Sequence, residues 1–402
     1  MTDATTIVDS RPKVTMRHGT EKRLTGGHPW AYSNEIEMTE AAKALPPGTL
    51  VTLIRADKRP LGAALFNPHS LIAARILSRD ATAEINQRFF EKRLQRALRL
   101  RERLIGAPYY RLVHAEADGF PGAVIDRFGE NVVVELNSAG MDLLAEPLIA
   151  AVDAVVKPKS ILLRGEGAAR QSEGLTPMTR FAKGEIAGPI ELLENGVKFL
   201  ADPAGGQKTG WFYDQRDNRA LMARFAKGAS FLDLYSYTGG FGIQAAVAGA
   251  SSVLAIDRSE AALDLLRKAA ALNGVDNRAA VQRGEAFEAL ETLLNEKRRF
   301  DIVSADPPAF VKSKKDFHVG SKAYRKLARL ACQAVEPGGL LFIASCSHNM
   351  PADEFAQQVA RGIHEGGRSA RQLYATGPAP DHPVHPFLPE SAYLKALVLQ
   401  ID

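Results

Sequence analysis

Short apolar or alternating runs fill the first eighty residues of the chain. Runs at residues 50–54 and 71–77 are separated by turn-forming pairs such as Gly26-Gly27, Pro46-Pro47 and Asn67-Pro68. Short strands with frequent Gly and Pro turns are typical of small β-barrels and sandwiches. We therefore predict a small β-barrel domain over residues 1–80.

A strongly basic helix follows this segment. Between residues 88 and 103 the only acidic side chains are Glu91 and Glu102, against these basic ones: Arg88, Lys92, Arg93, Arg96, Arg99, Arg101 and Arg103. Such a helix face is either simply solvated or contacts a polyanion. For the second alternative we expect Arg88, Arg93 and Arg96 to contact an RNA backbone.

A second folding unit surrounds and follows the basic helix. Strand patterns at 122–127, 131–136 and 160–164 flank a helical stretch at 141–156, which predicts an α+β domain over residues 81–193. The segment 191–199 predicts a hairpin, because its central Asn195-Gly196 pair accepts the positive φ values of a two-residue turn.

From residue 229 the pattern alternates between strand and helix. Expected strands are 231–234, 252–256, 301–304 and 339–344, with helices at 260–272 and 323–335. This alternation predicts a doubly wound, Rossmann-like α/β sheet over residues 194–402. Ligands of such sheets bind beyond the carboxyl ends of the strands, so the chemistry is expected there.

Composition narrows the class of protein. The formal net charge of +5 favours polyanionic partners. No apolar run approaches the roughly 18 residues of a membrane span, and the first residues are polar, so we expect a cytoplasmic protein without a membrane partner. Cys332 and Cys346 have no zinc-type spacing, and we expect no metal.

A glycine turn follows the first expected strand of this sheet. It reads Asp233-Leu234-Tyr235-Ser236-Tyr237-Thr238-Gly239-Gly240-Phe241-Gly242. The glycines let the backbone pass close to a ligand and open the next helix, whose positive end would face that ligand. Asp257, at the end of the second strand, is either a helix N-cap or the acceptor for both ribose hydroxyls. Together these residues indicate a nucleoside cofactor.

The turn after the 301–304 strand indicates which class of enzyme would use this nucleoside cofactor. It reads Asp306-Pro307-Pro308-Ala309-Phe310, and two consecutive prolines end the strand and stiffen the turn. The turn presents Asp306 and backbone carbonyls, which suit the amino or ring-nitrogen edge of a base. Dehydrogenases have no use for such a loop, so methyl transfer to a base is favoured.

Cys346 follows the 339–344 strand, at the same edge of the sheet. Cys332 instead falls on the apolar face of the last expected helix and is predicted to be inert. C5 of a pyrimidine becomes nucleophilic only after a thiolate adds to C6, whereas methylation at nitrogen needs no thiol. Cys346 is thus either a packed strand-end residue or a nucleophile, assisted by positive charge at Lys208 or Lys312 and by Asp306.

These residues resemble the bacterial class I rRNA methyltransferases with an N-terminal PUA domain, whose best-known member forms 5-methylcytosine in 23S rRNA. The shared segments span nearly the whole chain: Gly27-His28-Pro29-Trp30, residues 116–122, Gly206-Gln207-Lys208-Thr209-Gly210, Asp214-Gln215-Arg216, the Asp-Pro-Pro turn, Pro337-Gly338-Gly339, Ser345-Cys346-Ser347 and Tyr393-Leu394-Lys395. The resemblance implies a PUA domain, a central α+β domain that shapes an RNA cleft, and a seven-stranded class I methyltransferase domain.

The resemblance also implies roles for individual residues. S-adenosylmethionine would bind with its ribose on Asp257 and its methionine part on the turn, and Glu285 would lie near the adenine amino group. Lys208 would meet phosphate or the cofactor carboxylate. The expected cofactor contacts are Asp233, Tyr235, Ser236, Thr238, Gly239, Gly240, Gly242, Asp257, Arg258, Glu285, Ala286, Asp306 and Pro307, and the expected RNA contacts are Arg88, Arg93, Arg96, Lys208 and Lys312.

Two departures from the family keep other functions open. Glu285 replaces the more usual Asp, and Ala309 stands where several RNA cytosine-5 methyltransferases carry a second cysteine that helps release the product. The alternatives are a methyltransferase acting on a ring nitrogen, such as guanine N7, and a non-catalytic RNA-binding assembly protein. The expected partner is 23S rRNA or the assembling large subunit, and a homodimer stays open.

Overall fold

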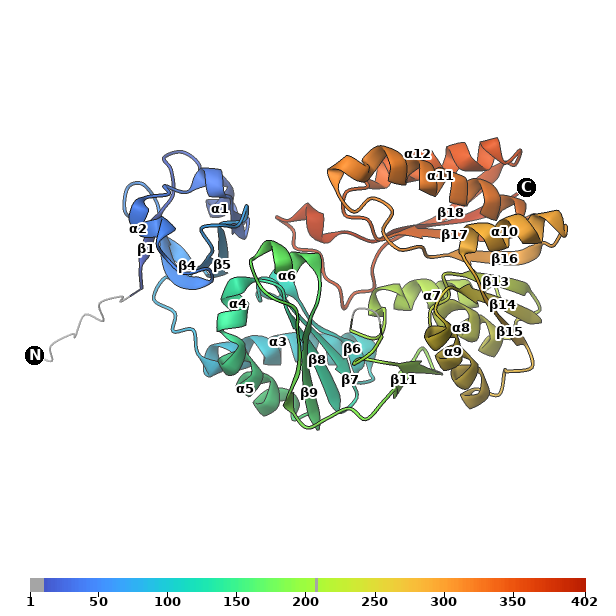
Figure 1. Ribbon diagram of the computed structural model, residues 1–402, viewed down its shortest axis with the longest axis horizontal. Coiled ribbons are helices and arrows are strands. Elements are labelled where there is room, and N and C mark those ends of the chain that lie inside the picture. Colours follow the sequence, from blue (N-terminus) through green and yellow to red (C-terminus); the bar gives the residue numbers. More distant parts are fainter. Residues whose placement is uncertain (1–10, 207–208) are drawn as a thin grey trace, which may run out of the picture. The chain divides into compact units, whose positions relative to one another are not determined.

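A computed structural model describes residues 11–206 and 209–402 (Figure 1). The chain forms two compact units: an N-terminal unit up to Ala187 that also includes Pro383–Ser391, and a C-terminal unit of Gly188–His382 and Ala392–Asp402. Within the described ranges, no helix is both long and apolar enough to cross a membrane. The predicted division at residues 80 and 193 stays a prediction.

The N-terminal unit begins with a small β domain, as predicted. Its five-stranded sheet has the order β1-β3-β4-β5-β2, and apolar side chains such as Val51, Leu53 and Phe66 form its core. The elements are β1 (Lys13–Thr15), α1 (Lys22–Thr25), β2 (Trp30–Ala31), η1 (Ser33–Glu35), α2 (Glu40–Lys43), β3 (Thr49–Ile54), β4 (Pro60–Phe66) and β5 (Ala74–Ser78).

A second five-stranded sheet, of order β10-β9-β8-β7-β6, completes this unit and confirms the α+β pattern. Phe90 and Leu94 of the long helix α3 pack with Leu148 of α5 into one core against the sheet. The elements are α3 (Gln87–Ile105), β6 (Tyr109–His114), η2 (Ala115–Asp118), β7 (Ala123–Phe128), β8 (Asn131–Leu136), α4 (Ala139–Leu143), α5 (Ala145–Val156), β9 (Ser160–Gly165), α6 (Ala168–Ser172) and β10 (Met178–Lys183).

The C-terminal unit opens with the predicted hairpin. Strands β11 (Ile190–Glu194) and β12 (Val197–Ala201) pair antiparallel. Asn195 and Gly196 between them have φ values of 52° and 79°, which a two-residue hairpin turn requires.

The main sheet of this unit has seven strands in the order β15-β14-β13-β16-β17-β19-β18, and only β19 runs antiparallel to its neighbours. This confirms the predicted seven-stranded, Rossmann-like sheet. The strands are β13 (Ser230–Leu234), β14 (Ser252–Asp257), β15 (Ala279–Arg283), β16 (Phe300–Ala305), β17 (Val335–Ser345), β18 (Ala370–Thr376) and β19 (Lys395–Ile401).

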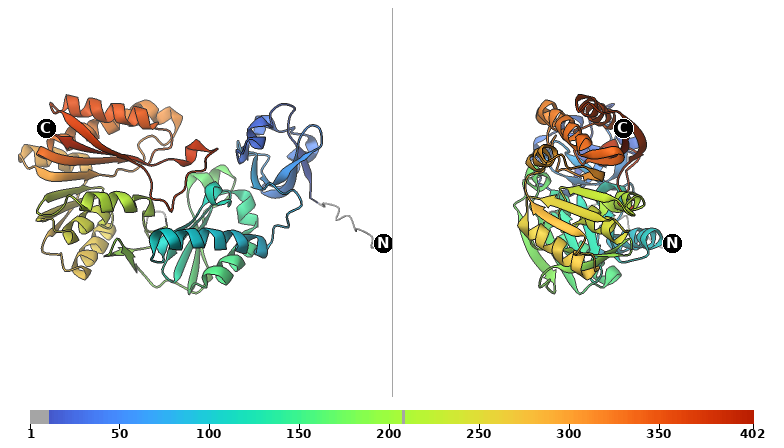
Figure 2. Two further views of the ribbon diagram at one scale, coloured as in Figure 1. Left: turned by 180° about the vertical axis from the view of Figure 1, so that it is seen from behind. Right: turned by 90° about the vertical axis from the view of Figure 1, so that its right-hand side faces the viewer.

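Helices cover both faces of the seven-stranded sheet (Figures 1 and 2). Helices α7, α8 and α9 lie on one face and α10, α11 and α12 on the other (Figure 1). The helices of this unit are η3 (Tyr213–Gln215), α7 (Arg216–Ala223), α8 (Gly240–Val247), α9 (Glu260–Leu272), α10 (Ala286–Asn295), η4 (Lys314–Asp316), α11 (Phe317–Gln333) and α12 (Ala352–Glu365), whereas η5 (Pro389–Ser391) belongs to the N-terminal unit. Because helices cover both faces, a ligand is expected to bind at the carboxyl ends of the strands.

Candidate active site

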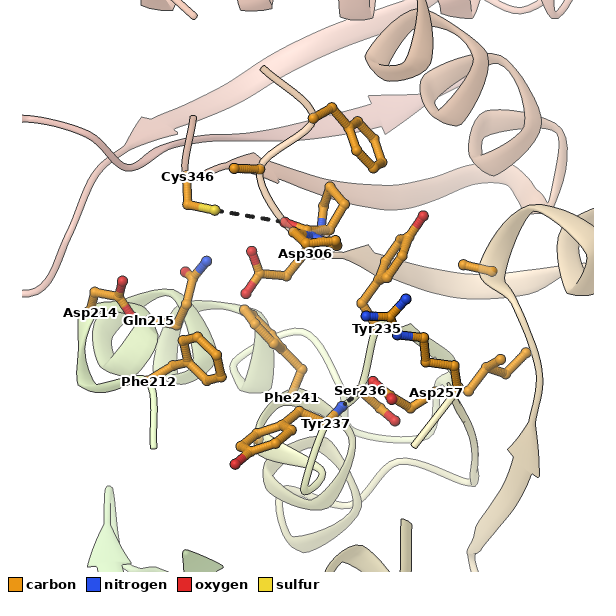
Figure 3. A pocket seen from close by; sticks show the side chains of 18 of the residues that line it. Phe212, Asp214, Gln215, Tyr235, Ser236, Tyr237, Phe241, Asp257, Asp306 and Cys346 are labelled. Atoms are coloured by element: carbon orange, nitrogen blue, oxygen red, sulfur yellow. Dashed lines mark hydrogen bonds between the residues drawn. The ribbon is translucent and has the colours of Figure 1, made fainter. Parts of the chain in front are cut away.

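A cavity of about 480 Å³ opens at this edge, lined by residues that follow four neighbouring strands (Figure 3). Ser236 follows β13, Asp257 ends β14, Asp306 follows β16 and Cys346 follows β17. The structure therefore brings together the polar residues that the strand pattern singled out. Asp257 and Ser236 lie toward one end of the cavity, and Asp306 and Cys346 toward the other.

Asp233 supports the cavity from behind and does not line it. Its side chain is only 1% exposed. One carboxylate oxygen accepts from the Gly242 amide at 2.8 Å and the other from the Ser304 hydroxyl at 2.7 Å. Burial raises the pKa of Asp233 to about 6. Asp233 thus ties the first turn of α8 to the sheet, which gives it an indirect role in ligand binding.

The glycine turn has a tightly wound backbone. Tyr235, Tyr237 and Gly239 have φ values of 59°, 49° and 90°. Left-handed backbone at non-glycine residues costs about 1–3 kcal/mol each and is concentrated at functional sites. A Cβ atom on Gly240 would lie 2.4 Å from Nε of Arg219, so only glycine fits there. The turn brings the positive N-terminus of α8 to the cavity wall.

Asp257 presents a fixed carboxylate to the cavity. Its two oxygens each accept one backbone N–H at 2.9 Å, from Tyr237 and Ser259. Each oxygen keeps a further lone pair, which suits the two hydroxyls of a ribose. Glu285 and Ala286, at the start of α10, line the same end of the cavity together with Arg258.

Two buried polar atoms show that this wall suits a polar ligand. The Ser236 hydroxyl and Nε of Arg219 belong to cavity-lining residues, and neither atom has a hydrogen-bond partner among residues 11–206 and 209–402. Buried polar atoms without partners are rare in proteins, and a bound ligand commonly satisfies them. The acceptor Asp257 together with the donors Ser236 and Arg219 fits a nucleoside that carries an amino-acid group.

Two loops, joined by hydrogen bonds, form the end of the cavity that contains Asp306 and Cys346. Sγ of Cys346 lies 3.9 Å from the carbonyl oxygen of Pro307. The buried Tyr324 hydroxyl is 2.8 Å from the hydroxyls of both Ser345 and Ser347. Ser347 in turn accepts from the Val311 amide at 3.1 Å. The Asp-Pro-Pro loop and the Cys346 loop are therefore fixed to each other.

Lys395 supplies a positive charge to the Cys346 loop. The sequence pointed to it only as part of the Tyr393-Leu394-Lys395 segment shared with the family. Its Nζ donates to the carbonyl oxygens of Ser347 and Met350 at 2.6 and 2.7 Å. Burial lowers the pKa of Lys395 to about 8, although attraction to the Cys346 thiolate opposes the shift. No local pattern in the sequence marks a lysine on β19 as a neighbour of this loop.

The other predicted site residues lie around the cavity or away from it. Thr238, Gly239 and Gly242 belong to the turn but do not line the cavity, and the exposed Lys312 does not line it either. Lys208 lies outside the described residues. Cys332 is fully buried in α11, and burial raises the pKa of its thiol to about 11, which agrees with its predicted inertness.

The structure adds cavity residues from η3 and from the residue before it. Asp214 and Gln215 lie on the side of Cys346, and Phe212 lies nearer Phe241 and Tyr237 (Figure 3). The sequence singled out residues 214–216 only through the family resemblance, since this short turn precedes the strand–helix alternation. Asp214 is held by the Tyr393 hydroxyl at 2.6 Å, and the Tyr393 ring stacks on His348.

The basic helix α3 of the N-terminal unit divides into two kinds of arginine. Arg88 and Arg96 are exposed, as an RNA contact requires. Arg93 instead donates to the carbonyl oxygens of Gly119 and Leu77, and burial lowers its pKa to about 10. Arg101 is fully buried and forms a two-pronged ion pair with Asp118. Arg93 therefore serves packing, which differs from its predicted exposure.

Comparison with known proteins agrees with this geometry. A family model of S-adenosylmethionine-dependent methyltransferases matches residues 176–400, and a PUA-like domain model matches residues 14–79. Ribosomal RNA large subunit methyltransferase I of Pseudoalteromonas atlantica is 36% identical over 393 residues, covering 97% of this chain and 99% of the relative. The protein of the same name from Shewanella amazonensis is 37% identical over 394 residues, with the same coverage.

Solved structures share the fold. A methyltransferase crystallised as a complex with SAH superimposes with a TM-score of 0.83 at 23% identity, covering 97% of this chain and all of the other. The cofactor of the matched family is S-adenosylmethionine, whose ribose and amino-acid groups fit the polar atoms of the cavity. The chain belongs to the S-adenosylmethionine-dependent methyltransferases, in the family of ribosomal RNA large subunit methyltransferase I.

Proposed function

We propose that the protein methylates C5 of a cytosine in 23S rRNA, with Cys346 as a covalent nucleophile. The observation that carries this proposal is the thiol of Cys346 beside the Asp306-Pro307 turn, in the cavity that also contains the cofactor-type residues. The names of the curated relatives support ribosomal RNA as the substrate. The substrate would be free rRNA or an assembling large subunit in the cytoplasm.

The proposed reaction begins at Cys346. Its thiolate adds to C6 of the base, forming the Sγ–C6 bond and moving the electron pair of the C5–C6 double bond into the ring. Bound S-adenosylmethionine supplies an electrophilic methyl group. C5 would take that methyl group as its bond to sulfur breaks and leaves a neutral thioether. A base would then remove the C5 proton, and the returning electron pair would restore the C5–C6 double bond as the Sγ–C6 bond breaks.

Several residues of this chain would assist these reaction steps. Asp257, Ser236 and the N-terminus of α8 orient the cofactor. Asp306 accepts a hydrogen bond from the amino group of the base and, carrying a proton, donates one to N3. Lys395 favours the thiolate form of Cys346. Tyr324 holds the two loops in position. The target base has to leave its stack, because a thiolate cannot reach C6 inside a helix.

RNA recognition is assigned to the N-terminal unit. Exposed side chains Arg88 and Arg96, with their neighbours Lys92, Arg99 and Arg103, form one side of α3, and within residues 11–206 and 209–402 none of the five forms an ion pair. Phosphate contacts of this kind supply affinity without reading sequence. The PUA-like domain is the second expected RNA contact.

The first prediction concerns Cys346. We expect Cys346→Ala to lower methylation of 23S rRNA from a strain lacking the enzyme by at least about a thousandfold, because no C6 adduct forms. Labelled cofactor and mass spectrometry of the nucleosides measure the product. Cys332→Ala, the same change at a buried thiol, is the matched control and should keep its activity.

Trapping the adduct provides an independent measurement. RNA carrying 5-fluorocytidine cannot lose a C5 proton, so wild-type enzyme should remain bonded to it on a denaturing gel, and Cys346→Ala should not. Undiminished methylation by Cys346→Ala would overturn the nucleophile. A methylated purine as product would overturn the cytosine assignment in favour of methylation at a ring nitrogen. That reaction needs no thiol, and a cavity with one cysteine and with Ala309 after the proline pair permits it.

A further inference from the structure

The side-chain amide of Gln215 lies in the cavity wall with both of its N–H donors unpaired among the described residues. Gln215 is 2% exposed and lines the cavity. Its Oε1 accepts a hydrogen bond from Nδ2 of Asn218 at 2.6 Å. Within residues 11–206 and 209–402, no acceptor is bonded to its Nε2, which lies on the side toward Cys346 and Asp306 (Figure 3).

The orientation of this amide is fixed by its neighbour. Nδ2 of the buried Asn218 also donates to the carbonyl oxygen of Gly377 at 3.3 Å. Turning the Asn218 amide over would place its oxygen against that carbonyl, so Asn218 has to present N–H groups to Gln215. The oxygen of Gln215 therefore faces Asn218, and its two N–H donors face the cavity.

The turn that carries Gln215 is itself held in place. Asp214, the preceding residue, accepts from the Tyr393 hydroxyl, and its backbone oxygen accepts from the Ala379 amide at 2.9 Å. An amide held this firmly reaches its partner with little loss of side-chain entropy. This amide donor faces the cavity and needs an acceptor once the site is filled, because a donor that a ligand covers and leaves unpaired is costly.

The chemistry of the proposed reaction identifies that acceptor. When the thiolate adds to C6, the displaced electron pair is delocalised over C5, N3 and O2 of the pyrimidine. Asp306 accounts for the amino and N3 edge, which leaves the O2 oxygen for a donor. We infer that Gln215 is a catalytic residue whose Nε2 donates a hydrogen bond to O2 of the target base and stabilises the charge of the C6 adduct.

This inference rests on the proposed function and adds a contact that acts mainly in the transition state. The O2 atom is more negative in the adduct than in the free base, so the hydrogen bond strengthens as the adduct forms. Removing the donor should therefore lower kcat more than it raises the KM for RNA. The cofactor affinity should stay unchanged, since Asp257 lies at the other end of the cavity.

The test compares three variants on 23S rRNA transcribed without modifications. We expect Gln215→Leu to lower kcat about 100- to 1,000-fold, the usual effect of losing one donor to a developing oxyanion, with the KM for RNA changed less than about threefold. Gln215→Glu keeps the shape of the side chain and titrates. Asn218→Asp leaves Gln215 intact but offers it only an acceptor, so the Gln215 amide turns over and its oxygen enters the cavity.

The pH profile separates this role from a structural one. An ionised glutamate at position 215 repels O2, whereas a protonated one donates to it, so the activity of Gln215→Glu relative to wild type should rise as the pH falls from 8 to 5.5. The relative activity of Gln215→Leu should stay flat over that range. Asn218→Asp should lose kcat to a similar extent as Gln215→Leu while binding the cofactor normally.

The kinetic results distinguish a catalytic role of Gln215 from a structural one, and both from a failure of the proposed function. Normal kcat of Gln215→Leu, or a flat pH ratio for Gln215→Glu, overturns the inference. So does a loss that runs in parallel with weaker cofactor binding and a lower unfolding temperature. If wild type forms 5-methylcytosine and Cys346→Ala does not, failure of the Gln215 variants rejects this inference alone. If Cys346→Ala stays active, the proposed function and the O2 contact fall together.

Discussion

Lys395 brings a positive charge from a different strand to the loop that carries Cys346. β19 runs antiparallel to β17, and Lys395 pairs with Ser345, the residue before Cys346. Its ammonium group bonds the loop backbone rather than a carboxylate. A cation in such a place stabilises a thiolate, which is the reactive form of cysteine.

We predict that Lys395→Met slows alkylation of Cys346 by iodoacetamide at pH 7 about 10-fold, and methylation by a similar factor. The pKa of Lys395 is about 8, so its charge is present below that pH and lost above it. The ratio of wild-type to variant rate should therefore fall toward one as the pH rises through 8.

Lys395→Arg is the control for this prediction, because arginine keeps its charge at every pH used. This variant should retain most of the alkylation rate, without the decline near pH 8. Equal alkylation rates for wild type and Lys395→Met at pH 7 would contradict the role of the charge.

The sequence predicted the residues that follow strands and missed those that reach the site from elsewhere. Asp257, Asp306 and Cys346 each end or follow an apolar run, so the topology of a parallel sheet brings them together. Gln215 and Lys395 come from a short 3-10 turn and an antiparallel strand. Their positions depend on tertiary packing, and no local pattern carries that information.

At the scale of elements, a helix defined by local sequence signals was predicted accurately, whereas a helix shaped by tertiary packing was not. Helix α9 has the predicted bounds because Ser259 caps it and its apolar positions repeat with the helical period. Helix α11 begins at Phe317, six residues earlier than predicted. That first turn contains Gly320, where a Cβ would lie 2.6 Å from the Phe310 carbonyl, so packing against the Asp-Pro-Pro loop requires a residue that disfavours helices.

Helix α3 carries the prediction that belongs to the scale of elements. We expect Arg96→Gln to weaken binding of 23S rRNA about 3- to 10-fold at low salt, since one phosphate contact is lost. The slope of log affinity against log salt should become shallower by about 0.7–0.9, the value for one fewer phosphate neutralised. Fluorescence anisotropy over a salt series measures both quantities.

Lys268→Gln is the matched control for Arg96→Gln. Lys268 is an exposed cation on α9, so its loss changes the net charge equally and should leave the slope unaltered. Identical slopes for wild type and Arg96→Gln would mean that this face of α3 is only solvated.

At the scale of the whole molecule, chain order and folding units do not coincide. Pro383–Ser391 lies between β18 and β19 in sequence but belongs to the N-terminal unit. There the Phe387 ring lies against Gly27, where a Cβ would be only 2.4 Å from the ring. A positive φ of 118° and this contact together explain glycine at position 27. The chain therefore connects its two units at three points, which a contiguous domain scheme does not show.

Within the N-terminal unit, one buried carboxylate joins the two sheets. Glu173, between α6 and β10, accepts from Asn67 at 3.1 Å, Ser70 at 2.9 Å and Arg75 at 3.1 Å, all three in the first β domain. Burial raises the pKa of Glu173, but Arg75 and the two hydrogen bonds outweigh burial and leave the pKa below its ordinary value. The carboxylate is thus charged and fully engaged at neutral pH.

We predict that Glu173→Ala lowers the free energy of unfolding of this unit by about 3–5 kcal/mol, because Arg75 and the donors of Asn67 and Ser70 lose their shared acceptor. Calorimetry should show the single transition of the unit separating into two, one for each sheet. Because the folded pKa is depressed, the stabilisation is present above the ordinary pKa of 4.5 and is lost as the pH falls below it, so wild type and variant should converge in acid. Glu173→Gln, which keeps an acceptor but no charge, should lose less. An unchanged single transition in Glu173→Ala would show that the two sheets stay coupled without Glu173, through contacts such as those of Trp30 and Arg75 with Glu116.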